Sequence, residues 1–151
     1  MENYAAGIIP YTLFENQIYF LLGRERSNDK WSGFVGSSEP NESIIQTALR
    51  EFNEETSLVF KNHIGYFLDK CSVVYPVTEK TPSGNNVYLW FIECPKTIFF
   101  TDLDQLIVNQ SFMEDSHYKE KSELRWFRID EISKRQDIFY RLKRTILKQF
   151  S

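Results

Sequence analysis

The sequence predicts an α/β domain, because two kinds of residue pattern follow one another along the chain. Residues 4–14 and 18–22 are apolar and β-prone, and the polar residues 15–17 between them predict the turn of a hairpin. Apolar side chains recur at helical spacing in residues 43–56 and again in residues 138–150. Strands and amphipathic helices are therefore both expected.

The middle of the chain supplies two more predicted strands of the same sheet. Residues 64–75 and 87–94 are rich in β-branched and aromatic residues. Residues 82–86, with the sequence Pro-Ser-Gly-Asn-Asn, have the composition of a turn. Residues 24–38 contain two glycines and two adjacent serines without a clear periodicity, which predicts a loop that leads into the first helix.

The last third of the chain is less regular before it closes. Residues 100–121 predict a long connecting loop with a short helix over 103–108. Residues 124–129 alternate as a strand does, and residues 138–150 predict a closing amphipathic helix.

Length and composition exclude several classes of protein. A chain of 151 residues fits one domain over residues 1–151, and its formal net charge of −3 argues against binding nucleic acid mainly through phosphate neutralisation. Cys71 and Cys94 lie in separate apolar segments without the spacing of a metal or redox pair, so free core thiols are expected. The sequence shows neither a signal peptide nor a long apolar run, which predicts a cytoplasmic protein with no membrane partner.

Three glutamates crowd one side of the first predicted helix. Glu51 and Glu54 lie beside its apolar arc, and Glu55 falls within the edge of that arc. Like charges at these spacings repel by a few tenths of a kcal/mol per pair, so the cluster needs a compensating charge. Magnesium would supply it, because Mg²⁺ binds carboxylate oxygens and bridges to phosphates. The competing interpretation is an ordinary solvated face of an amphipathic helix.

A longer pattern favours the first interpretation. It runs from Gly36 through five residues to Glu42, then through seven residues to 50–58, Arg-Glu-Phe-Asn-Glu-Glu-Thr-Ser-Leu. This arrangement resembles the Nudix box, the signature of the MutT-like hydrolases, at every fixed position except the final glycine, where Ser57 stands. The resemblance continues in Trp-Ser-Gly-Phe-Val-Gly at 31–36 and in Glu-Leu-Arg-Trp-Phe at 123–127.

The resemblance implies a fold and a set of residue roles. The implied fold is the Nudix fold, an α/β/α sandwich around a mixed β-sheet. Glu54 and Glu55 match the family's principal metal ligands, and Glu51 matches a ligand or a base. Arg50 matches the residue that orients Glu51, and the carbonyl of Val35 lies where a backbone metal ligand often occurs. The implied cofactor is Mg²⁺, with Mn²⁺ as an alternative.

Two other carboxylates are candidates by position. Glu42 matches the first glutamate of the box, which in relatives is structural or supports the metal site. Family members often add a metal-binding or basic carboxylate from the loop before the late strand, and Glu120 has the most suitable spacing, with Glu123 and Glu114 as rivals. The alternative interpretation of each loop acid is a solvated surface charge.

Two departures from the family pattern have physical consequences. Ser57 replaces a glycine that favours the left-handed conformation at the end of the helix, at a cost on the order of 1 kcal/mol. Ser37 and Ser38 follow Gly36 where many relatives have more glycine, so this backbone is expected to approach phosphate less freely.

The high aromatic content, 16%, suggests side chains that stack on a nucleotide base. Trp31, Tyr75 and Trp90 are the candidates, although Trp90 lies in a predicted strand, which favours a core position. Arg24 and Arg26 flank the loop before the box and are expected either to bind phosphate or to be exposed loop charges. Tyr75 and the proline after it do not choose between dinucleoside polyphosphates and ADP-ribose.

The resemblance therefore implies a pyrophosphohydrolase. The expected substrate is a small-molecule nucleotide: a nucleoside diphosphate linked to another group, such as a nucleotide sugar or a dinucleoside polyphosphate. Removal of an RNA cap or cleavage of inositol pyrophosphates is the alternative within the family, and only the first of these would make nucleic acid a partner. A third hypothesis is a Nudix-fold module that binds a nucleotide without cutting it. The sequence does not decide whether the protein forms a homodimer.

Overall fold

The computed structural model describes residues 3–150, and it begins with the expected hairpin. Strands β1 (Tyr4–Phe14) and β2 (Gln17–Glu25) pair antiparallel through a two-residue turn. The turn residues Glu15 and Asn16 have φ of 49° and 64°, the left-handed conformation that matches the twist of the flanking strands. The hairpin prediction is confirmed.

Seven strands form one mixed sheet within residues 3–150. Its main order is β3-β2-β1-β6-β5, with β4 also paired to β1 and β7 also paired to β2. The parallel pair is β1 with β6, while the other pairs are antiparallel. The remaining strands are β3 (Trp31–Ser32), β4 (Phe34–Ser37), β5 (Val77–Lys80), β6 (Asn86–Glu93) and β7 (Lys121–Arg128). The expected loop 24–38 thus contains two short strands.

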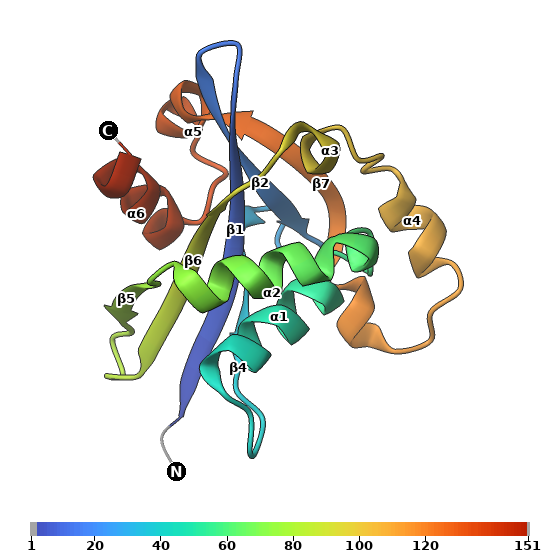
Figure 1. Cartoon of the computed structure of the whole chain (residues 1–151), viewed down its shortest axis with the longest axis vertical. Helices are drawn as coiled ribbons and strands as arrows, with labels where there is room; N and C mark the ends of the chain where they lie inside the picture. The colour runs from blue at the N-terminus through green and yellow to red at the C-terminus, as the bar shows by residue number, and fades with distance from the viewer. Residues whose placement is uncertain (1–2, 151) are drawn as a thin grey trace.

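Helices cover both faces of this sheet (Figure 1). On one side, α1 (Ile44–Glu55) and α2 (Ile64–Val73) pack on a core that includes Ile8, Phe34 and Trp90. On the other side, α5 (Ile129–Lys134) and α6 (Tyr140–Phe150) pack on a second core. Neighbouring residues of β1 enter opposite cores, as the alternation of a strand requires. The chain is α/β with a mixed central sheet, as the sequence predicted.

The predicted strand over residues 64–75 is wrong, because most of this segment forms the helix α2. Phe67 and Cys71 are four residues apart and both are buried, which is the spacing of one helix face. The ring of Phe67 lies 4.6 Å from that of Phe52 on α1. Packing against α1 therefore overrides the β-propensity of the segment.

The region expected as a long loop contains short helices. Within residues 100–121 these are α4 (Gln105–Gln110) and η2 (Ser116–Lys119). Two further short helices lie outside that region: η1 (Lys61–His63) before α2, and α3 (Lys96–Phe99) after β6. The short helix expected over 103–108 corresponds to α4. The late strand and the closing amphipathic helix are confirmed as β7 and α6. None of the described helices has the length and apolar character needed to cross a membrane.

The ends of α1 fix the helix on which the glutamates lie. Ser43 caps its N-terminus, where its Oγ accepts from the Gln46 backbone N–H and Gln46 accepts from Ser43 in return. Beyond the C-terminus, Ser57 and Leu58 have φ of 50° and 61°. The left-handed conformation predicted at Ser57 is thus present in a residue with a side chain, which is fully buried.

Buried hydrogen bonds compensate the strain at Ser57. Its Oγ donates to the Tyr118 carbonyl at 2.5 Å and accepts from Gln110 Nε2 at 3.0 Å, while its carbonyl accepts from Asn109 Nδ2 at 2.8 Å. A glycine would relieve the strain and lose the two side-chain bonds. The departure from the box therefore ties the end of α1 to the segment that precedes β7.

Candidate active site

Arg50 on α1 forms hydrogen bonds with three glutamates of the candidate site. Its Nε donates to Glu42 Oε2 at 2.6 Å, and its Nη1 donates to Glu51 Oε1 at 2.9 Å and to Glu54 Oε2 at 3.2 Å. Its Nη2 donates to the Ser37 carbonyl at 2.8 Å. A planar guanidinium can satisfy several carboxylates in fixed directions, which an ammonium cannot do. Arg50 thus contacts the glutamate that it is predicted to orient, and this role stays a prediction.

Glu42 is the carboxylate most strongly held by Arg50. It accepts two bonds from the guanidinium, one from the Glu39 backbone N–H and one from the Thr47 hydroxyl. The hydrogen bond from Arg50 is the largest cause that lowers the pKa of Glu42 to about 2. These four bonds use both oxygens of the carboxylate and hold it in place, which fits a supporting role.

Glu51 packs against the backbone of Gly36. A Cβ built on Gly36 would lie 2.1 Å from Glu51 Cδ, so no larger residue fits unless the carboxylate moves. Burial raises the pKa of Glu51, and the neighbouring Arg50 opposes this shift. The glycine of the box is needed here for close approach, and it makes room for a carboxylate beside β4.

Glu55 lies on the opposite side of the cluster and faces a different cation. Its side chain is 4% exposed, and its Oε1 lies 3.3 Å from Lys121 Nζ. Burial raises the pKa of Glu55 well above its ordinary value, while Lys121 lowers it and Glu51 raises it further. Its other oxygen, Oε2, is buried and has no hydrogen-bond partner among residues 3–150.

Lys121 is a fully buried cation that the sequence did not identify. Its Nζ donates to Glu25 Oε1 at 2.5 Å, to Ser32 Oγ at 2.6 Å and to the Gly33 carbonyl at 3.0 Å. Together with Glu55, four oxygen-bearing groups surround this ammonium. Gly23 leaves room for its stem, because a Cβ there would meet Lys121 Cδ at 2.8 Å.

The loop candidate Glu120 is exposed and lies at the end of η2. Its carbonyl accepts from the Arg26 backbone N–H at 2.9 Å, which ties the loop to the end of β2. Glu120 also raises the pKa of Glu55, so its charge acts on the buried carboxylate. Its rival Glu123 instead approaches Arg24, at 4.0 Å.

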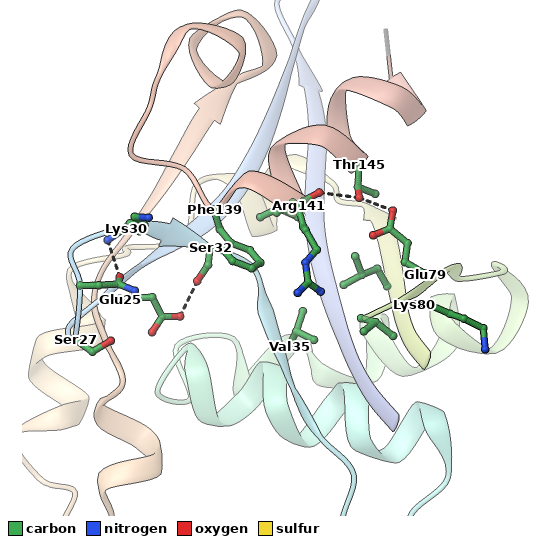
Figure 2. Close-up of a pocket in the computed structure, with 15 residues that line it drawn as sticks. Glu25, Ser27, Lys30, Ser32, Val35, Glu79, Lys80, Phe139, Arg141 and Thr145 are labelled. Carbon is green, nitrogen blue, oxygen red and sulfur yellow. Dashed lines mark hydrogen bonds between the residues drawn. The ribbon is translucent and has the colours of Figure 1, made fainter. Parts of the chain in front are cut away.

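A cavity of about 390 Å³ lies between the sheet and α6 (Figure 2). The volume falls in the range of sites for small ligands, roughly 300–1,000 Å³. Its sheet side includes Glu25, Ser32, Gly33 and Val35. Glu25, Ser32 and Gly33 are also hydrogen-bond partners of Lys121. Because Lys121 pairs with Glu55 as well, this lysine connects the cavity to α1, the carboxylate helix that carries Glu51, Glu54 and Glu55.

Positive charge and one aromatic ring enter the cavity from the other elements. Figure 2 shows Arg141 extending from α6 toward Val35, with Phe139 beside Ser32 and Lys80 on the far rim. Phe139 is 45% exposed, which leaves its ring accessible. The cavity therefore combines an apolar surface with cationic groups, as a nucleotide requires.

Comparison with known proteins decides the family. A model of the NUDIX domain matches residues 1–150 of the chain. The chain belongs to the Nudix family. The Nudix box therefore accounts for the spacing of Gly36, Glu42 and the glutamates of α1.

Solved Nudix structures share the fold at low sequence identity. An Ap4A hydrolase of C. elegans is 20% identical with a TM-score of 0.56, and the alignment covers 97% of this chain and 94% of that one. A mutT/nudix family protein from Listeria innocua is 17% identical with a TM-score of 0.58, covering 98% and 91%. The NUDIX domain of Shewanella oneidensis NrtR, solved with ADP ribose, is 14% identical with a TM-score of 0.56, covering 100% and 90%. These likenesses establish the fold.

One relative is closer in sequence over a shorter stretch. An uncharacterized protein of Acanthamoeba polyphaga mimivirus is 40% identical over 75 residues, which is 46% of this chain. The match spans only 23% of the relative's own length. The aligned stretch thus corresponds to a small part of that larger protein.

The residues of this Nudix domain fit a hard divalent cation. Glu51, Glu54 and Glu55 offer carboxylate oxygens, and the buried Oε2 of Glu55 has a desolvation cost that a cation would relieve. Among residues 3–150 no three Asp, Glu, His or Cys side chains converge as a ready metal cluster. The reason is that the carboxylates turn toward Arg50 and Lys121.

The three predicted substrate contacts lie outside the cavity lining. Trp31 is buried, with its ring 4.8 Å from that of Phe127. Tyr75 is 93% exposed in the segment after α2, and Arg24 pairs with Asp29 at 3.6 Å. Their roles as substrate contacts stay predictions. The sequence did not identify Phe139 and Arg141, because residues 138–150 show only the pattern of an amphipathic helix. The cavity they line exists only once α6 packs on the sheet.

Proposed function

We propose that this Nudix domain hydrolyses the pyrophosphate linkage of a nucleoside diphosphate joined to another group. The observation that supports this most directly is the meeting of the carboxylate helix and the cavity. Val35 lines the cavity and precedes Gly36, on which the carboxylate of Glu51 packs. Glu55 and the cavity residue Glu25 share Lys121. A phosphate in the cavity would therefore lie next to carboxylates suited to a metal ion.

We assign the metal to Glu51, Glu54, Glu55 and the carbonyl of Val35, with Mg²⁺ as the ion and Mn²⁺ as a substitute. When bound, such an ion polarises a phosphoryl group and lowers the pKa of bound water. Arg50 keeps Glu51 and Glu54 oriented through charge-assisted bonds. To Glu120, which is exposed and whose charge acts on the buried Glu55, we assign the role of accepting a proton from water.

The cavity side chains select the substrate class. Phe139 presents an accessible face on which a base can stack, and Arg141 and Lys80 offer cationic groups to a diphosphate. Glu25 and Glu79 also line the cavity, so its charge is mixed. A mixed charge with an apolar surface suits a nucleotide better than a densely phosphorylated inositol, which needs a strongly basic site.

The test is hydrolysis of a panel of substrates with Mg²⁺ or Mn²⁺: nucleotide sugars, dinucleoside polyphosphates, oxidised nucleotides, capped RNA and inositol pyrophosphates. Glu54→Gln should lower kcat/KM on the accepted substrate by on the order of 10²–10³-fold, the several kcal/mol that a bound metal contributes. Glu15→Gln, in the turn of the hairpin at the far end of β1, is the matched control that should keep wild-type activity (Figure 1).

Each alternative has its own signature in that panel. Activity on capped RNA alone would favour decapping, and activity on inositol pyrophosphates would place the substrate outside nucleotides. A wild-type protein that binds nucleotide and hydrolyses nothing, with Glu54→Gln unchanged from wild type, would indicate a binding module.

A further inference from the structure

The buried ammonium of Lys121 occupies a position with the chemistry of a cation site. Its neighbours are all oxygens: a carboxylate from Glu25, a carboxylate from Glu55, the Ser32 hydroxyl and the Gly33 carbonyl, at 2.5 to 3.3 Å. Carboxylate, hydroxyl and carbonyl oxygens are also the ligands that hard divalent cations take in proteins. Lysine is rarely this buried unless it is paired.

The backbone is built to bring this lysine inside. The register of β2 and β7 shifts after Arg24, so that Glu25 lies opposite Lys121 and Ser122 is skipped. A bulge of this kind redirects a side chain to the other face of a strand. Gly23 clears the space for the stem, and the Phe34 ring lies 5.7 Å from Nζ.

Glu55 shows the effect of this arrangement on the metal ligands. Its Oε1 faces Lys121, whereas its Oε2 is buried and has no hydrogen-bond partner in the described part of the chain. The lysine thus holds one oxygen of the carboxylate and makes no hydrogen bond to the other. A divalent ion on the Lys121 side would have to displace the ammonium.

We propose that Lys121 is a resident cation that takes the place of a divalent ion between Glu55 and Glu25, and so limits the number of metal ions in the site. The proposal rests on the proposed metal-dependent function. Lys121 acts as a positioning residue: it directs Glu55 toward the metal through one oxygen and joins this carboxylate to the cavity residues Glu25, Ser32 and Gly33. The protein thereby supplies one permanent positive charge where a divalent ion would supply two.

The test counts bound Mn²⁺ by electron paramagnetic resonance on chelator-stripped protein, without nucleotide and with ADP. Lys121→Ala removes the ammonium and should bind one more Mn²⁺ per chain than the wild type. The double variant Glu25→Gln with Lys121→Ala also lacks the negative charge of one of the two carboxylates and should lose that additional ion. Equal numbers of Mn²⁺ in the wild type and in Lys121→Ala would overturn the proposal.

Two further results keep the test decisive if Lys121→Ala is unstable. If it folds only in the presence of Mn²⁺, as followed by circular dichroism, the ion has replaced the ammonium; if saturating Mn²⁺ does not restore folding, the proposal fails. The single variant Glu25→Gln keeps Lys121 and should retain the wild-type number of ions. A loss of one ion there, or a tenfold weaker affinity (roughly 1.4 kcal/mol), would make Glu25 a metal ligand and contradict the proposal.

The wild-type measurement separates this proposal from the proposed function. If the wild type binds no Mn²⁺ even with ADP, the metal-dependent function itself fails. If the wild type binds Mn²⁺ and the number does not change in Lys121→Ala, only the role of Lys121 is lost.

Discussion

Two cations divide the glutamates of this Nudix domain between them, and they do so in different surroundings. Arg50 is 22% exposed and contacts Glu42, Glu51 and Glu54 through separate nitrogens. Lys121 is fully buried and contacts Glu25 and Glu55, with two neutral oxygens completing its shell. The guanidinium distributes its donors over a plane, whereas the ammonium fits a closed pocket.

The comparison shows that a cationic partner does not by itself decide the state of a carboxylate. Glu42 and Glu55 each face a cation, but the pKa of Glu42 is lowered to about 2 and the pKa of Glu55 is raised. Arg50 gives Glu42 short hydrogen bonds near solvent, while burial is the largest cause of the shift at Glu55. Burial disfavours the charged form of Glu55 more than that of Glu42. Additional positive charge would therefore stabilise ionised Glu55 more than ionised Glu42.

The largest expected effect on stability comes from removing the buried cation, Lys121. Lys121→Met should lower the free energy of unfolding of the metal-free protein by about 3–5 kcal/mol near pH 8, because it leaves the buried carboxylate of Glu55 and the partly buried one of Glu25 without their cation. Since the pKa of folded Glu55 is raised, stability from its protonated form is present at low pH and is lost as pH rises through that pKa. The deficit of Lys121→Met should therefore shrink near pH 5, which urea denaturation in EDTA can measure. A deficit independent of pH would contradict this account.

The next effect comes from changing the geometry of the other cation without changing its charge. Arg50→Lys cannot reach Glu42, Glu51 and Glu54 together, and should cost about 2 kcal/mol in the free energy of unfolding, with kcat lowered about 10–100-fold. The matched control is Arg128→Lys, whose guanidinium pairs with Asp130 at the surface, and which should change stability by less than about 0.5 kcal/mol. Similar losses in the two variants would show that charge alone matters at Arg50.

The smallest of these effects concerns Glu42 and depends on pH. Glu42→Gln should lower the free energy of unfolding by about 1–2 kcal/mol at neutral pH, because it weakens the charge-assisted bonds to Arg50. The pKa of folded Glu42 is depressed from 4.5 to about 2, so its contribution is full above about pH 4.5 and is lost as pH falls toward about 2. Urea denaturation at several pH values should show the wild type and the variant converging over that interval. A difference in stability between the two proteins that persists near pH 2 would show that the charge of Glu42 is not its cause.

The residues around Arg50 could be predicted from the sequence, whereas Lys121 could not. Glu42, Arg50, Glu51, Glu54 and Glu55 are recognisable because they lie within one helix and its approach, where spacing determines which face a residue shares. Lys121 was missed because a bulge between β2 and β7 decides the face to which it points. The predicted strand at 64–75 failed for a similar reason, since contacts with α1 outweigh local propensity there.

The sequence by itself determined the α/β class, the family and the carboxylate helix, because local periodicity and the spacing of the box carry that information. Only the tertiary structure decided that α6 closes a cavity over the sheet, that Glu55 is buried while Glu42 remains near solvent, and that a lysine far along the chain is the counter-ion of Glu55. Burial and long-range pairing arise when distant segments pack together, and packing depends on all of them at once.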